Sequence, residues 1–142
     1  MKAANYIEWK LDDAYELDGD DPLGEVRISG EEGCIVESCT YLDSFLEALI
    51  NGISQIDNSN QKISVDPMVE PDNIDLEYID NVLRISYGSQ CAFIHDLKQM
   101  KNALTKAVRR LVEKIDDLTD QKSKERRQLL FLRQYLQQSD SS

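Results

Sequence analysis

The sequence predicts an α+β fold: an antiparallel sheet of about six strands, with helices on one face and one more helix appended at the C-terminus. Three observations predict it. Short segments place apolar side chains at every second residue, as half-buried strands do. Two longer segments place them at helical spacing. The order strand, strand, strand, helix then occurs twice within the 142 residues, a length that suits one small domain.

The first half of the chain supplies three of these strands. Residues 6–11 alternate isoleucine, tryptophan and leucine with charged side chains, which predicts a strand with one apolar face. Residues 25–29 and 34–38 are the next two strand segments. The Gly-Glu-Glu-Gly turn between them predicts that they pair as a hairpin.

A helix follows this hairpin. Its apolar residues fall at i, i+3, i+4, i+7, i+8 and i+11, which is a single stripe at helical period. These residues are Leu42, Phe45, Leu46, Leu49, Ile50 and Ile53. Thr40 is expected to be the N-cap, with the acidic Asp43 three residues later as in a capping box.

The second half repeats this plan. The strand segments are a short one at 62–65 and longer ones at 74–79, 82–87 and 91–95. Asp80-Asn81 is typical of a tight hairpin turn. Asp96 is expected to cap a long helix that runs to about Leu118.

The two halves also resemble each other residue by residue. Val-Arg-Ile-Ser at 26–29 matches Leu-Arg-Ile-Ser at 83–86 at an offset of 57, and the same offset carries Cys34 onto Cys91. The helix stripes match at an offset of 58. These pseudo-repeats, 5–56 and 74–118, favour an internal duplication of a βββα unit within a domain spanning 1–118. Convergence of two similar patterns is the alternative.

Residues 119–142 are expected to form a C-terminal helix with a frayed tail. The helix carries an apolar cluster: Leu129, Leu130, Phe131, Leu132, Tyr135 and Leu136. Four consecutive apolar residues are unlikely to stay bare in water. The cluster therefore either folds back onto the open sheet face of its own chain or packs against a second copy or a partner, as in a homodimer.

Charge is distributed unevenly along the chain, whose net charge is −11. Residues 1–95 hold 20 acidic and 5 basic side chains, whereas residues 96–142 hold 7 acidic and 11 basic ones. The acidic body disfavours nucleic acid and favours a basic protein partner; solubility alone is the alternative. The candidate partner-binding surface is an acidic loop: Asp12, Asp13, Glu16, Asp18, Asp20 and Asp21.

No catalytic residues, metal site or cofactor are predicted. The three cysteines lack the spacing of a zinc site or a disulfide framework, and they are expected to be reduced thiols, at least two of them packed in strands. His95 is the only histidine, and in an extended strand it lies too far from Cys91 to activate it. The acidic loop does not fit an EF-hand, because Tyr15 and Leu17 stand where ligands are needed.

These patterns together favour a non-enzymatic acidic protein-binding module, for example an immunity-type inhibitor of a cationic bacterial toxin. The alternatives are an adaptor or chaperone-like homodimer assembled through the C-terminal helices, and an enzyme of unrecognised type, which would need a concave polar pocket. No apolar run is long enough to span a membrane and no secretory signal is visible, so no membrane partner and a cytoplasmic location are expected.

Overall fold

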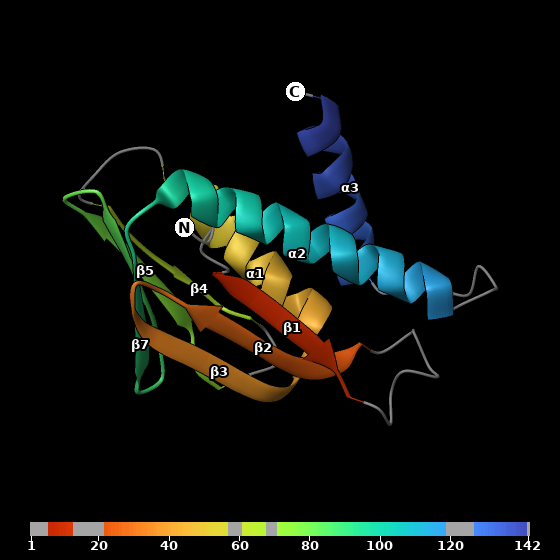
Figure 1. The fold of residues 1–142 in the computed structure, drawn as a ribbon, viewed down its shortest axis with the longest axis horizontal. Coiled ribbons are helices and arrows are strands. Elements are labelled where there is room, and N and C mark those ends of the chain that lie inside the picture. The colour runs from red at the N-terminus through yellow and green to blue at the C-terminus, as the bar shows by residue number, and fades with distance from the viewer. Residues whose placement is uncertain (1–5, 13–21, 57–60, 68–70, 119–126, 142) are drawn as a thin grey trace.

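A computed structural model describes residues 6–12, 22–56, 61–67, 71–118 and 127–141, and it confirms an antiparallel α+β architecture (Figure 1). One seven-stranded sheet has the order β1-β2-β3-β7-β6-β5-β4. The strands are β1 (Ile7–Leu11), β2 (Leu23–Ser29), β3 (Glu32–Tyr41), β4 (Gln61–Val65), β5 (Ile74–Ile79), β6 (Val82–Tyr87) and β7 (Gln90–Ile94). The helices are α1 (Leu42–Ile53), α2 (Leu97–Leu118) and α3 (Arg127–Ser141).

The strand count is one higher than the predicted six, because the short segment before β5 pairs along its whole length. β4 runs antiparallel to β5 from the Gln61–Tyr78 pair to the Val65–Ile74 pair, and it forms an edge of the sheet. At the other edge, β1 pairs with β2.

The helices lie on one face of the sheet (Figure 1). Helix α1 contacts strands on one side and both other helices on the other, while α2 reaches β1. This position explains why eleven of the twelve residues of α1 are buried, including polar Asp43, Ser44 and Glu47. A helix covered on two sides needs no polar face.

Three contacts that involve polar groups help to fix the helix layer. The indole nitrogen Nε1 of Trp9 in β1 donates a hydrogen bond of 2.9 Å to the carbonyl oxygen of Ala107 in α2, and the Arg110 guanidinium lies 5.4 Å from the Trp9 ring centre. At the start of α3, Arg127 donates to both carboxylate oxygens of the largely buried Glu47, at 3.2 and 3.4 Å. Each contact joins elements far apart in the sequence.

The start of α1 differs from the prediction. The N-cap residue is Tyr41, with no side-chain capping bond, rather than Thr40. The reason is that β3 continues through this point and pairs Thr40 with Gly24 and Tyr41 with Leu23, so Thr40 belongs to the sheet. Asp43 accepts a hydrogen bond from the backbone nitrogen of Ser44 instead, at 2.8 Å.

The predicted turn and cap in the second half are confirmed. Asp80 and Asn81 have φ values of 53° and 65°, the left-handed conformation that a two-residue type I′ hairpin requires. The side chain of Asp96 accepts a 3.0 Å hydrogen bond from the backbone nitrogen of Gln99 and so caps α2.

The two halves of the chain meet at a single seam in the middle of the sheet. Strands β1, β2 and β3 form one antiparallel group, β7, β6 and β5 form another, and β3 pairs with β7 between them. Counting outward from the seam, the strands are β3, β2 and β1 on one side and β7, β6 and β5 on the other, with β4 added at the far edge. The duplication itself stays a prediction.

Candidate functional site

We call the face of the sheet opposite the helices the open face. Its side chains are aligned in rows. Strand alternation sends the core residues to the helices and leaves the intervening side chains outside. The register aligns these side chains in rows that cross the strands. One row is Lys62, Glu77, Arg84, Phe93 and Glu32; the next is Ser64, Asp75, Ser86, Cys91, Cys34 and Ser29.

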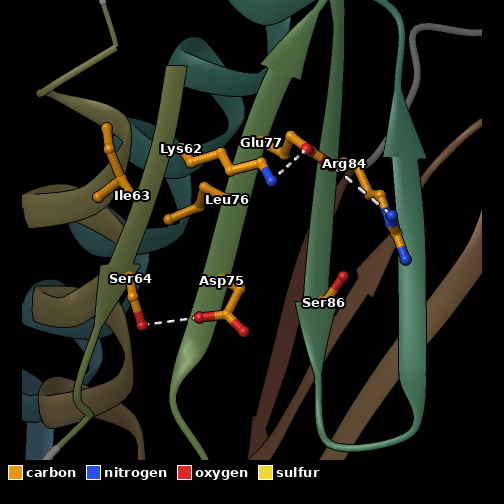
Figure 2. Close-up of a pocket in the computed structure, with 8 residues that line it drawn as sticks. All are labelled: Lys62, Ile63, Ser64, Asp75, Leu76, Glu77, Arg84 and Ser86. Atoms are coloured by element: carbon orange, nitrogen blue, oxygen red, sulfur yellow. Dashed lines mark hydrogen bonds and ion pairs between the residues drawn. The ribbon is translucent and has the colours of Figure 1, made fainter. Parts of the chain in front are cut away.

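The first row is built around Glu77 on β5. Its carboxylate forms ion pairs with Lys62 of β4, at 3.4 Å, and with Arg84 of β6, at 3.6 Å; Figure 2 shows both pairs. The Arg84 guanidinium also lies 6.0 Å from the centre of the Phe93 ring. The two cations on these strands are thus paired with one shared acid.

The second row begins with neutral and acidic groups and ends with two thiols. The hydroxyl of Ser64 donates a 2.7 Å hydrogen bond to Asp75 (Figure 2) and accepts one of 3.2 Å from the amide of Asn73. Further along the row, Cys91 and Cys34 stand opposite each other on β7 and β3. Both are free thiols in strands; the side chain of Cys39 lies outside the described residues.

A shallow hollow of about 510 Å³ lies over these strands (Figure 2). Its lining residues are Lys62, Ile63, Ser64, Asp75, Leu76, Glu77, Arg84 and Ser86. Most of its charged groups are bonded to one another, which suits a contact surface better than a site prepared for proton transfer.

The predicted acidic loop is only partly described. Asp12 is half-buried and its backbone nitrogen donates a 3.0 Å hydrogen bond to the carbonyl oxygen of Leu23. Its other members lie outside the described residues: Asp13, Glu16, Asp18, Asp20 and Asp21. The pairing of Leu11 with Gly24 nevertheless brings the two ends of this connection together at the edge of the sheet.

The predicted oligomer contact is largely engaged within its own chain. Leu129, Leu132 and Leu136 are buried in the hydrophobic core, and α3 packs on α1 and α2 rather than on the open sheet face that the sequence suggested. Phe131 and Tyr135 are partly buried beside them, and the Tyr135 hydroxyl lies 2.7 Å from that of Thr105. Leu130 remains 48% exposed.

Glu31, in the turn between β2 and β3, is paired with Tyr6, the residue before β1. The Tyr6 hydroxyl donates a 2.6 Å hydrogen bond to Glu31, whose other oxygen accepts one of 3.0 Å from the backbone nitrogen of His95. Burial, followed by this bond and the charge of Glu31, raises the pKa of Tyr6 to about 12. Burial acts to raise the pKa of Glu31, but the bonds from Tyr6 and His95 prevail and lower it.

Within the described part of the chain, no group of three or more histidine, cysteine or acidic residues is arranged to hold a metal ion. No described helix is long and apolar enough to cross a membrane. His95 is exposed at the end of β7, as the sequence suggested.

Sequence reasoning missed the rows of the open face and the opposed thiols. The alternation within each strand was visible, and so was the match of Cys34 with Cys91. What was missing was the pairing of β3 with β7, which joins residues 57 positions apart. No protein-family model, curated protein or solved structure matches this chain.

Proposed function

We propose that this chain is a non-enzymatic protein-binding module whose acidic sheet layer engages a cationic protein. An immunity-type inhibitor of a basic toxin is the concrete form of this proposal. The observation that carries it is the separation of charge: residues 1–95, which contain the sheet and α1, hold 20 acidic and 5 basic side chains. Complementary charge accelerates encounter and excludes wrong partners.

The fold places the basic C-terminal helices on one side of the sheet. The basic side chains of the C-terminal part belong to α2, α3 and the segment between them, and both helices lie on the covered side of the sheet. The acidic connection between β1 and β2 begins and ends at the edge of the sheet, because Leu11 pairs with Gly24. This connection contains six acids within ten residues.

The open face supports a binding role because the basic side chains of β4 and β6 are already paired with an acid. Lys62 and Arg84 are already paired with Glu77. A partner that lies across this surface would meet polar groups held in fixed positions by the strands. A rigid surface loses little entropy when it binds.

The test uses the full chain, tagged, as bait in a lysate of its native cell at low salt. We expect it to retain a basic protein that elutes as salt rises, because ionic contacts are screened. A variant with Asp12, Asp13, Asp18, Asp20 and Asp21 changed to asparagine should lose that protein.

The control neutralises three exposed acids near the opposite edge of the sheet and outside the hollow, Asp66, Asp72 and Asp80. It should retain more of the partner than the loop variant. Recovery of no specific protein, or equal recovery by both variants, would overturn the proposal.

The homodimer is the second candidate, favoured by the exposed Leu130 on α3. Light scattering at increasing protein concentration tests it. A dimer that Leu130→Glu dissociates would support it. A chain that remains monomeric at high concentration would contradict it.

A further inference from the structure

Two cysteines stand side by side at the seam between the halves of the sheet. Strands β3 and β7 pair through three register positions, the last of which is Cys34 opposite Cys91. Residues opposite each other in an antiparallel pair have Cα atoms about 4.5–5.5 Å apart. Disulfides need Cα atoms about 4.4–6.8 Å apart. The backbone therefore already holds the two residues within bonding range.

The neighbouring contacts identify the type of pair. The Gln90 side chain accepts a 2.8 Å hydrogen bond from the backbone nitrogen of Val36 and donates one of 3.0 Å to its carbonyl oxygen. The backbone of Val36 thus faces β7, and that of Cys34, two residues earlier, faces the same way. Cys34 and Cys91 form the hydrogen-bonded type of pair, with Cα atoms about 5.5 Å apart.

The Cys34 thiol is accessible and lies among polar groups. The residue is exposed on the open face. Its Sγ atom is 3.9 Å from an Nη1 atom of Arg27, which donates to it, and 3.8 Å from the hydroxyl oxygen of Ser29. Partly exposed, electropositive surroundings are typical of cysteines that react.

The Cys91 thiol has matching surroundings from the other half of the chain. The Ser86 hydroxyl donates to its Sγ atom at 3.9 Å. Arg84 is the neighbouring cation, and its hydrogen bond to Cys91 is the largest cause that raises the pKa of this arginine above its usual value. The arginine, serine and cysteine of each half are those that the offset of 57 aligns.

We propose that Cys34 and Cys91 are a redox-active thiol pair, which a small disulfide of the glutathione class oxidises to an interstrand disulfide. The exposed Cys34 thiolate attacks one sulfur of the oxidant, forms a mixed disulfide and releases one small thiol. The Cys91 thiolate then attacks the Cys34 sulfur and expels the second. Two protons and two electrons leave the protein, and two small thiols are formed from the oxidant.

The second step requires only side-chain rotation and slight adjustment of the strands. Each sulfur now lies beside a serine on its outer neighbouring strand, so both χ1 angles must turn toward the seam. Such turns are fast for accessible side chains. The bond would cross-link the two halves of the sheet and close a long loop, which stabilises the folded chain relative to the unfolded one.

The test incubates the purified full chain with oxidised and reduced glutathione at defined ratios and blocks remaining thiols with iodoacetamide. Mass spectrometry should show that two of the three cysteines escape alkylation. Digestion after glutamate separates Cys34 from Cys39 at Glu37, so the linked peptides identify the pair. The oxidised form should unfold at higher urea concentration than the reduced form.

Cys39→Ser is the matched control and should leave both the bond and the urea shift intact. Cys34→Ser and Cys91→Ser should each abolish both, and Cys91→Ser should accumulate a mixed disulfide with glutathione at Cys34. Three alkylated cysteines at every ratio, or a bond that includes Cys39, would overturn the proposal. The wild-type mapping decides the matter even where a serine variant folds poorly.

Discussion

The two faces of the sheet use the same strands for different ends. On the covered face, Phe45 of α1 packs edge-on against Tyr87 of β6 with ring centres 5.5 Å apart, and neither is appreciably exposed. On the open face, the aromatic residue Phe93 is only half-buried beneath Arg84. Stability therefore resides in the covered face, because burial of apolar area drives folding. The open face is left free to carry polar groups, ion pairs and thiols.

The largest difference in stability between the two faces is expected when the same substitution is made on each. Phe45→Ala should lower the free energy of unfolding by about 4 kcal/mol, because it removes a fully buried ring and leaves a cavity. Phe93→Ala should cost roughly 1 kcal/mol, the scale of a cross-strand contact. Urea unfolding measures both, and equal losses would show that the two faces contribute alike.

The seam between the halves is tested by two glycines with left-handed φ, Gly33 at 79° and Gly88 at 59°. An alanine Cβ at Gly33 would lie 2.1 Å from the carbonyl oxygen of Cys91, whereas at Gly88 it meets only the Asp72 side chain at 3.0 Å. Gly33→Ala should cost roughly 3 kcal/mol and Gly88→Ala about 1 kcal/mol in thermal unfolding. A tolerated alanine at 33 would mean that the seam is loosely paired.

Ion pairs should follow the same division. Arg127→Ala leaves Glu47, whose side chain is only 12% exposed, without this partner; since Arg127 is itself 66% exposed, solvent screens the pair and the loss should be about 1 kcal/mol. Lys62→Ala removes a lysine that is 79% exposed and should change stability by less than about 0.5 kcal/mol. A larger loss for the lysine in chemical unfolding would contradict this order.

The last expected effect concerns the dependence of stability on pH. The pKa of Glu31 is lowered from 4.5, so its contribution is present above pH 4.5 and is lost as pH falls through the lowered value. The pKa of Tyr6 is raised from 10.0 to about 12, so its contribution is present below pH 10.0 and is lost as pH rises toward about 12.

Tyr6→Phe should therefore cost about 1 kcal/mol near neutral pH, the scale of one hydrogen bond. Its difference from the wild type should shrink toward both extremes of pH. Stability curves from pH 3 to pH 12 measure this. A difference that grows as the solution is acidified would show that the Tyr6–Glu31 bond is not its source.

Local patterns predicted most of the elements for identifiable reasons. The stripe of α1 and the Asp80-Asn81 turn depend on neighbouring residues, whose chemistry is read directly from the sequence. The prediction that Thr40 caps α1 was wrong because threonine also suits a strand. Only the pairing of β3 with β2 decides which of these two roles Thr40 takes. The burial of Glu47 could not be predicted from the sequence either, because it depends on where α3 packs.

The sequence by itself determined the strand and helix pattern, the acidity of residues 1–95 and the likeness of the two halves, because each depends on composition or local period. The tertiary structure decided which side chains share a surface. It placed Cys34 opposite Cys91, turned the apolar residues of α3 into the core and aligned the open face in rows. Strand order and register bring together residues that are distant in the sequence. The two-residue alternation within a strand does not indicate which other strand pairs with it, or in which register.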